Sequence, residues 1–377
     1  MEISIFGPSK KFLSGVSYYT IRLSNALSEF ADVNAILFRH MLPKRIFPGW
    51  KRVGRELTKL KFADKVKVYE ILDWYNPLTW IKAYGVIKES DVVIFQWWTS
   101  SVAHMYVFIE ILNKISKDVP IIVEFHEVLD PLENSILPIK IYSRFMGKVL
   151  RRFASHYVVH SKADKQLVCG IYNISSERVT VIPHGVYDHY ERVEKDKAKE
   201  LLNIEEDFVI LFFGLLRPYK GVKYLIKAFE LLPKDVIENS RLLIVGETWE
   251  DRESVKIAEN SKYRDKITIV NEYVPDDEVS LYFSIADVLV LPYTRASQSG
   301  VAHIAMSFGL PIIATNVGGL RESLSKYEGT TFVETKSPKG IADAILEVYN
   351  KRKMYSPPNE LKWENIAKKW MQMLSNL

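Results

Sequence analysis

The sequence predicts an α/β protein of two Rossmann-like domains, each with a doubly wound parallel sheet, that face a common cleft. Three observations support this fold class. Short apolar runs alternate with amphipathic stretches along the chain, which is typical of parallel strands covered by helices on both faces. A polar segment containing Pro183 and Gly185 interrupts the alternation near the middle. The length of 377 residues also exceeds the size at which a single core stops growing.

Short apolar runs give the expected strands. In the first half they are Ile3–Phe6, Val33–Phe38, Val66–Tyr69, Asp91–Gln96, Pro120–Phe125, His156–His160 and Val179–Pro183. In the second half they are Phe208–Phe213, Arg241–Gly246, Lys266–Val270, Asp287–Leu291, Pro311–Thr315 and Thr330–Val333. Helical patterns lie between them, for example at Ser17–Phe30, Val102–Ile115 and Val222–Leu232. Each half of the chain therefore has its own sheet.

The polar segment at 182–194 is the expected linker between the two domains. We expect an N-terminal domain at residues 1–184 and a C-terminal domain at residues 185–359. Residues 360–377 contain a last helical pattern, which we expect to pack back on the first domain. A cleft between two such domains is the usual place for a ligand.

Composition indicates a folded protein of a reducing compartment. Hydrophobic residues make up 47% of the chain and charged residues 26%, and no apolar run reaches the roughly 18 residues of a spanning helix. The single cysteine, Cys169, excludes an internal disulfide. The opening MEISIF is acidic and strand-like, which argues against a signal peptide. We therefore expect a cytoplasmic protein.

Basic residues are concentrated in two segments, although the formal net charge is only +5. The first segment contains Arg39, Lys44, Arg45, Lys51, Arg52, Arg55, Lys59 and Lys61; the second contains Lys140, Arg144, Lys148, Arg151 and Arg152. Basic residues interleaved with large apolar ones favour contact with an anionic membrane surface, here the inner face. A plainly solvated basic face fits equally well. Nucleic acid is not an expected partner, because no recognisable RNA- or DNA-binding motif accompanies these segments.

One loop in the second half carries the strongest indication of a ligand. The strand at 208–213 ends at Gly214, and Arg217 and Lys220 follow before the helical pattern at 222–232. Such a loop lies at the carboxyl end of its strand, where open α/β sheets bind ligands. Two cations beside a helix start suit a diphosphate. The alternative is that both side chains only solvate the loop.

The chain resembles the GT-B nucleotide-sugar glycosyltransferases of the large retaining family 4. The resemblance rests on FFGLLRPYKG at 212–221, LLIVG at 242–246, YVPDDEVSLYFSIADVLVLPY at 273–293 and SGVAHIAMSFGLPIIATNVGGLRE at 299–322. In the first half it is confined to SGVSYYTIRLSNAL at 14–27, EFHE at 124–127 and VVHS at 158–161. The resemblance implies an acceptor-binding first domain and a second domain that binds the nucleotide sugar.

The resemblance gives the two cations a catalytic role. Arg217 and Lys220 would stabilise the negative charge that the nucleoside diphosphate gains as the glycosidic bond breaks, and Gly214 begins their loop. Most relatives carry the arginine where this chain has Leu215, so the match at Lys220 is the closer one.

Other residues are implied in donor binding. Tyr273 or Val274 would supply an apolar contact to the nucleobase, which could be uracil or guanine. Gly318 and Gly319 would let the backbone approach the donor closely, although a simple strand-to-helix turn is the alternative. Gly15 would contact the donor phosphates or the acceptor.

The chain departs from the family at its Glu-x7-Glu motif. Ala296 and Ile304 stand where relatives carry the two glutamates. Neutral or weakly basic groups of this stretch would have to bind the sugar, phosphate or ribose instead, and they are Ser297, Gln298, Ser299, Gly300 and His303. The departure leaves open a protein that binds a nucleotide sugar with little or no turnover.

His126 is the expected catalytic residue of the first half. In related enzymes a histidine near this location approaches the donor sugar, and an imidazole can bond the sugar or exchange a proton near neutral pH. Glu127 could orient the imidazole or meet the acceptor. The alternative is a structural histidine held by Glu124 or Glu127.

The sequence thus predicts a retaining hexosyltransferase that moves a sugar from a UDP- or GDP-sugar to a glycan or lipid-linked acceptor. No Asp-x-Asp stands at a suitable strand end, and no histidine or cysteine spacing is that of a zinc site. We therefore expect no cofactor and no metal. The alternative is a catalytically weak or inactive binding or scaffold protein of the same fold.

Overall fold

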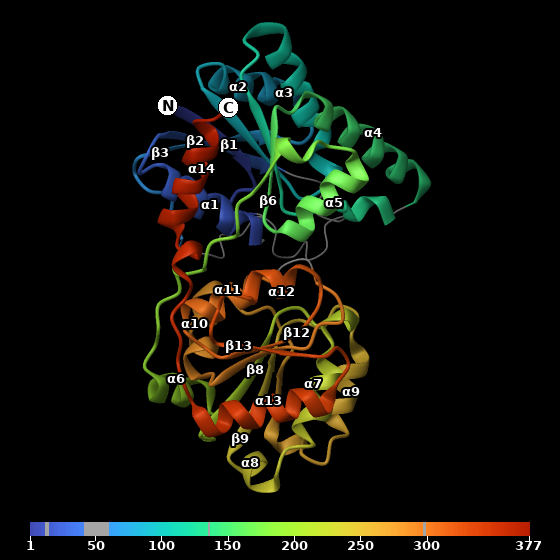
Figure 1. Ribbon diagram of the computed structural model, residues 1–377, viewed down its shortest axis with the longest axis vertical. Helices are drawn as coiled ribbons and strands as arrows, with labels where there is room; N and C mark the ends of the chain where they lie inside the picture. Colours follow the sequence, from blue (N-terminus) through green and yellow to red (C-terminus); the bar gives the residue numbers. More distant parts are fainter. Residues whose placement is uncertain (12–14, 41–59, 135, 297–298) are drawn as a thin grey trace. The chain divides into compact units, whose positions relative to one another are not determined.

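The structure, a computed structural model, describes residues 1–11, 15–40, 60–134, 136–296 and 299–377 (Figure 1). Most of the first basic segment, Ser297 and Gln298 therefore lie outside the described residues. The described chain divides into unit 1, Met1–His184 with Trp363–Leu377, and unit 2, Gly185–Lys362. No helix within the described ranges is both long enough and apolar enough to cross a membrane.

Unit 1 contains a seven-stranded parallel sheet in the order β3-β2-β1-β4-β5-β6-β7. The strands are β1 (Glu2–Gly7), β2 (Asp32–His40), β3 (Val66–Asp73), β4 (Val92–Trp97), β5 (Ile121–Phe125), β6 (His156–Val159) and β7 (Val179–Val181). The order changes direction between β1 and β4. Ligands of open α/β sheets bind at the carboxyl ends of the strands beside such a switch point.

Helices cover both faces of this sheet (Figure 1). They are α1 (Gly15–Leu27), α2 (Pro77–Ile87), α3 (Ala103–Ser116), α4 (Leu137–Phe153), α5 (Lys162–Tyr172) and α14 (Trp363–Leu374). Successive strand residues point to opposite faces, so Ile94 packs in the core with α1 and α14 while Phe95 packs in the core with α2 and α3. Two hydrophobic layers therefore hold the sheet.

The last helix, α14, belongs to unit 1 although all of unit 2 precedes it in the sequence. Its residues Ile366 and Trp370 are fully buried and share a core with Tyr19 and Leu23 of α1. The apolar face of α14 recurs at helical spacing, which matches burial against one partner.

Unit 2 contains a six-stranded parallel sheet in the order β10-β9-β8-β11-β12-β13. The strands are β8 (Phe208–Phe213), β9 (Ser240–Val245), β10 (Ile267–Val270), β11 (Val288–Leu291), β12 (Ile312–Thr315) and β13 (Thr330–Val333). The helices are α6 (Lys195–Leu202), α7 (Val222–Phe229), α8 (Lys234–Glu238), α9 (Arg252–Glu259), α10 (Asp276–Ile285), α11 (Gly300–Ser307), α12 (Gly318–Leu324) and α13 (Pro338–Lys351). Here the switch point lies between β8 and β11.

The predicted fold class is confirmed, and every expected strand is present. The largest error in the predicted strand bounds is at β3. Strand β3 continues to Asp73 because its pairing with β2 persists through register shifts. Asp276 and Asp277 lie in the first turn of α10, where their charges favour the helix N-terminus.

A buried carboxyl group on α3 makes the stability of unit 1 depend on pH. Glu110 is 1% exposed, and neither of its carboxyl oxygens has a hydrogen-bond partner among the described residues. Burial raises the pKa of Glu110 to about 9 from its ordinary value of 4.5. The folded protein therefore holds a proton that the unfolded chain releases between these two values.

We expect the free energy of unfolding to fall by up to about 1.4 kcal/mol per pH unit as the pH rises from 4.5 towards 9, because the unfolded state binds fewer protons. Glu110→Gln should flatten this slope and stabilise the protein at pH 8. Urea unfolding across this pH range measures both effects. The control is Glu89→Gln, at a side chain that is 62% exposed; equal slopes in all three proteins would contradict the expectation.

Candidate functional site

The predicted cation loop of unit 2 lies at the switch point of its sheet. The loop begins at Gly214, directly after β8. Its backbone is hydrogen-bonded to the turn that follows β9, because the Leu216 N–H donates to the Glu247 carbonyl at 3.0 Å. This pairing brings Arg217 over the ring of Trp249, with 4.8 Å between the guanidinium carbon and the ring centroid. Arg217 is thus held by the loop that follows β9.

Lys220 is held by the loop that follows β11. Its Nζ lies 3.9 Å from the centroid of the Tyr293 ring. Thr294 N–H donates to the Tyr219 carbonyl at 2.8 Å, which bonds the two loops directly. Gly221 permits this contact, because its φ is +68° and a Cβ there would lie 2.0 Å from the Pro292 carbonyl oxygen. The loops after β8 and β11 therefore form one rigid element.

This element carries cations that no described carboxylate neutralises within ion-pair distance. They are Arg217, Lys220 and a third one, Arg295, whose guanidinium carbon lies 5.2 Å from the centroid of the Tyr219 ring. Arg217 Nε is buried and has no hydrogen-bond partner in the part of the chain that the structure describes. Native proteins rarely leave such a group unsatisfied, and an anion would satisfy it. The sequence prediction did not include Arg295, because its support comes from a ring 76 residues earlier.

The stretch that we expected to take the place of the family glutamates lies next to this element. Ser299 caps α11, since its hydroxyl accepts from the Ala302 N–H, and Gly300 begins the helix. His303 and Ile304 are buried on α11, at 2% and 7% exposure. No carboxylate stands at Ile304, where the chain presents an aliphatic side chain instead. Ser297 and Gln298 lie outside the described residues.

Gly318 and Gly319 lie against the same stretch. The Gly319 N–H donates to the Ala296 carbonyl at 3.3 Å. Gly318 has a φ of +46°, and a Cβ there would lie 2.1 Å from that carbonyl oxygen. The loop after β12 thus adjoins the loop after β11. The predicted residues of this region all follow the three neighbouring strands β8, β11 and β12: Gly214, Arg217, Lys220 and Ser299 in the connecting segments, and Gly300, Gly318 and Gly319 in the first turns of α11 and α12.

The candidate nucleobase residues lie toward the other edge of the sheet. Tyr273 and Val274 follow β10, and Val274 is buried while Tyr273 is half-buried. Their segment is fixed to the turn after β9, because Asn271 Oδ1 accepts from Thr248 N–H at 2.8 Å. Tyr273 and Val274 therefore lie on the same side of the cation loop as Trp249.

In unit 1, His126 follows β5 at the carboxyl edge of the sheet. The backbone N–H of His126 donates to the Trp97 carbonyl at 2.8 Å. The ring of Tyr19 lies 4.7 Å from the His126 ring, centroid to centroid. Tyr19 comes from α1, which Gly15 begins. Glu127 is exposed as a residue, but burial of its carboxyl group raises the pKa of that group.

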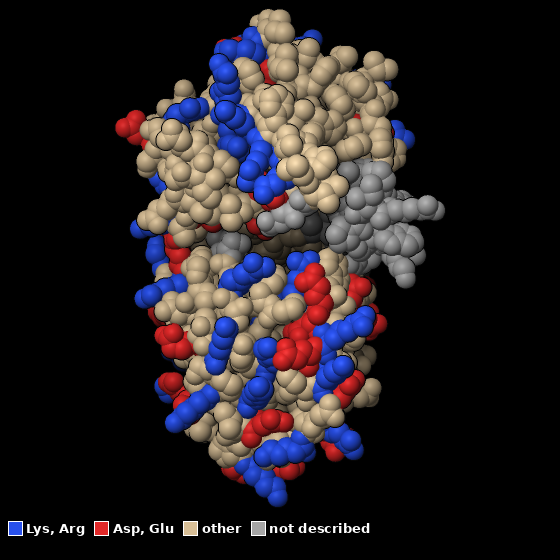
Figure 2. All heavy atoms as spheres, turned by 90° about the vertical axis from the view of Figure 1, so that its right-hand side faces the viewer, with Lys and Arg blue, Asp and Glu red and all other residues tan. Residues whose placement is uncertain are grey.

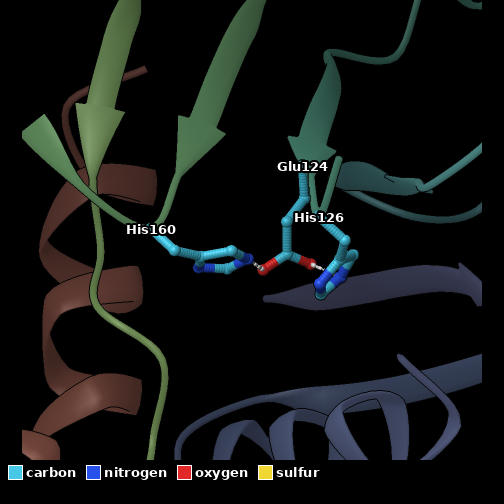
Figure 3. A group of neighbouring side chains, drawn as sticks. All are labelled: Glu124, His126 and His160. Carbon is cyan, nitrogen blue, oxygen red and sulfur yellow. Dashed lines mark ion pairs between the residues drawn. The ribbon is translucent and has the colours of Figure 1, made fainter. Parts of the chain in front are cut away.

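Glu124, His126 and His160 form a cluster that we call the carboxylate–imidazole trio (Figure 3). Glu124 is the penultimate residue of β5, and His160 follows the neighbouring strand β6. His126 Nε2 lies 3.7 Å from Glu124 Oε2, and His160 Nε2 lies 3.9 Å from Glu124 Oε1. Side-chain exposure is 7% for His126, 3% for His160 and 0% for Glu124. Figure 3 shows both rings directed at the carboxylate between them.

The trio shifts the pKa values of its own members. Burial alone would raise the pKa of Glu124, but the nearby His126, His160 and Tyr19 outweigh it and lower that pKa. Burial lowers the pKa of His160 to about 4, and the charge of His126 adds to the effect. Glu124 is therefore an anion and His160 a neutral imidazole at neutral pH.

Of the described residues, the trio is the one group of three or more whose carboxylate and imidazole atoms lie within metal-binding distance of one another, all within 4.8 Å. The sequence prediction considered only spacing along the chain and found no such group. His160 was missed as a site residue because its proximity to His126 follows from the pairing of β5 with β6.

Two family models match the chain: Glycosyltransferase Family 4 over residues 13–189 and Glycosyl transferases group 1 over residues 193–370. An uncharacterized glycosyltransferase of Methanocaldococcus jannaschii is 29% identical over 225 residues, which are 55% of this chain and 56% of the relative. A lipopolysaccharide 1,2-N-acetylglucosaminetransferase of Salmonella typhimurium is 26% identical over 216 residues, 52% of this chain and 56% of the relative. These alignments span about half the length of the curated relatives.

Among solved structures, Anabaena HepE in complex with UDP is similar with a TM-score of 0.68 and 16% identity, and the superposition covers 100% of both chains. At this identity the similarity concerns the fold alone. Both sheets described above thus have counterparts in a structure determined with a nucleotide.

Proposed function

Because the chain belongs to the family-4-type glycosyltransferases of the GT-B fold, we propose that it transfers a hexose from a UDP- or GDP-sugar to a glycan or lipid-linked acceptor. The observation that carries the proposal is the rigid element of unit 2, which presents Arg217 and Lys220 at the switch point without neutralising them. HepE, a structural neighbour, has been solved with UDP-glucose, which supports a uridine diphosphate sugar as the first donor to test.

The chemistry of the donor explains why cations are needed. When the bond from the anomeric carbon to the phosphate oxygen breaks, the nucleoside diphosphate leaves with the electron pair and gains negative charge. Preorganised cations stabilise that charge more than they stabilise the intact donor, and this difference accelerates the reaction. Arg217 and Lys220 are preorganised because the Trp249 and Tyr293 rings restrict their rotamers.

We propose retention of configuration by attack on the same face. The acceptor oxygen bonds the anomeric carbon on the side from which the diphosphate leaves, and a phosphate oxygen takes the acceptor proton. This scheme requires no carboxylate nucleophile, which suits a chain with Ala296 and Ile304 in place of the family glutamates. His126 would contact the sugar, and Glu127 would meet the acceptor or orient the imidazole. Cations of the protein would replace a metal, so we propose turnover without one.

The second candidate is a protein that binds the nucleotide sugar without turnover. The observation that favours it is the buried aliphatic side chain of Ile304, since the family carries a carboxylate there. One measurement distinguishes the two candidates: whether the protein forms product steadily from any of a set of UDP- and GDP-sugars.

Lys220→Ala should lower kcat by roughly 100- to 1,000-fold, as the loss of one preorganised charge-stabilising group does in other enzymes. The matched control is Lys227→Ala, at an exposed lysine of α7, which should retain activity. Product analysis with UDP- and GDP-sugars measures both. Turnover that Lys220→Ala abolishes would exclude the non-catalytic candidate; folded wild-type protein that transfers no sugar from any donor would exclude the transferase.

We also propose that the enzyme binds the inner membrane surface through α4. Leu137, Ile141 and Phe145 recur every fourth residue and are 68%, 59% and 61% exposed. Lys140, Lys148 and Arg152 lie beside this apolar stripe. Figure 2 shows lysine and arginine side chains gathered in a band on unit 1, on the side where α4 lies in Figure 1, next to uncharged surface. Apolar side chains flanked by cations suit an anionic lipid interface.

Wild-type protein should float with vesicles that contain anionic lipid and stay unbound with neutral vesicles. Replacing Ile141 and Phe145 together by serine should release it. The control is Ile115→Ser, which removes an apolar side chain of α3 that is 78% exposed. Flotation that is insensitive to anionic lipid, or equal release by the control, would remove this part of the proposal.

A further inference from the structure

The carboxylate–imidazole trio contains three buried polar atoms that converge without hydrogen-bond partners. They are Glu124 Oε1, His126 Nε2 and His160 Nε2. None has a hydrogen-bond partner among the residues that the structure describes, and the two nitrogens face the Glu124 carboxylate oxygens at the ion-pair distances of 3.7 and 3.9 Å. Buried polar atoms in folded proteins are nearly always satisfied, so three such atoms around one point need a common explanation. A positively charged ligand at that point would accept all three lone pairs.

Neighbouring groups orient the trio toward that point. His160 Nδ1 donates to the Ile182 carbonyl at 3.0 Å, so the ring presents the Nε2 lone pair to Glu124. Gln96 Nε2 donates to Glu124 Oε2 at 3.2 Å and holds the carboxylate. Outer partners of this type are found behind the histidine and carboxylate ligands of metal sites.

The distances suit a small transition-metal ion. Tetrahedral zinc has bonds of about 2.0–2.1 Å to nitrogen and oxygen, so its ligand atoms lie roughly 3.4 Å apart. His126 Nε2 lies 3.7 Å from Glu124 Oε2 and His160 Nε2 lies 3.9 Å from Glu124 Oε1; with one ligand atom from each residue, all three atoms lie within 4.8 Å of one another. Side-chain rotations that shorten these separations by roughly 0.3 to 1.4 Å would close the site. Two imidazoles and one carboxylate are ligands that zinc accepts, with the fourth position open.

We propose that Glu124, His126 and His160 bind one Zn²⁺ or a similar divalent transition metal. A bound metal would engage the lone pair of His126. The consequence for activity rests on the proposed function: since transfer needs a free His126 and no metal, Zn²⁺ should inhibit it. Removal of the metal by a chelator should restore the rate.

The test uses the full chain after chelator treatment and dialysis. Co²⁺ serves as the probe, because its visible d–d absorption reports four-coordinate binding with nitrogen ligands, and Zn²⁺ should displace it. We expect one metal ion per chain, measured by equilibrium dialysis and metal analysis. His160→Asn keeps a side-chain donor for the Ile182 carbonyl but removes Nε2. It should weaken binding by more than the roughly 10–100-fold seen when only an outer partner is lost.

The matched control is His156→Asn, at the first residue of β6, the strand that His160 follows; the His156 Nε2 bonds the Thr180 hydroxyl at 2.8 Å, outside the trio. It should bind Co²⁺ like the wild type. Thermal unfolding shows whether each variant is folded, and Glu124→Gln provides a second test if His160→Asn is not. Absence of the Co²⁺ spectrum in the wild type, or equal binding by wild type and His160→Asn, would overturn the site. Metal binding without any sugar transfer would leave the site standing and refute the transferase instead.

Discussion

The contact of Gly221 with the Pro292 carbonyl is the constraint on which the candidate donor site depends. It joins the loops after β8 and β11, the two strands that flank the switch point of unit 2. A side chain at Gly221 would separate these loops, and Lys220 would lose its place over Tyr293. The position of a charged group is thus set by a backbone contact that only glycine allows.

The way in which the cations are held also decides what they can bind. A carboxylate partner would neutralise Lys220, whereas the buried aromatic face of Tyr293 attracts it by about 0.5–2 kcal/mol and leaves the charge available. Arg217 and Arg295 are also held by aromatic rings, Arg217 over Trp249 and Arg295 near Tyr219. Unit 1 has the opposite arrangement at its sheet edge, because Glu124 is an anion buried among imidazoles. One unit thus carries unneutralised positive charge at its sheet edge, and the other carries a carboxylate between two imidazoles.

The fold was predictable from the sequence because each strand is a local signal. Apolar runs such as 208–213 are bounded by glycine or polar residues, and parallel sheets bury both faces of their strands. The position of the cation loop followed from the same signal. Glu110, an acidic residue in an apolar helix, could not be recognised as buried before the packing of α3 was known.

The partners of the site residues were not predictable, since they depend on the order of the strands. Trp249 meets Arg217 because β9 pairs with β8, and His160 meets Glu124 because β6 pairs with β5. The spacing of residues along the sequence does not indicate which strands pair in either sheet. For the same reason a metal site assembled across two strands escapes a search for local ligand motifs.

Binding of UDP and GDP to the Gly221→Ala variant, measured by isothermal titration calorimetry, tests the central claim most directly. The account predicts that this variant binds the preferred diphosphate at least about tenfold more weakly, because a cation that contributes a charge-assisted bond is displaced. Gly309→Ala is the matched control, since Gly309 has a similar φ of +62° and a Cβ there would lie 2.4 Å from the Tyr355 carbonyl oxygen. It should bind the nucleotide like the wild type. Equal affinity of folded Gly221→Ala and wild-type protein would contradict the account.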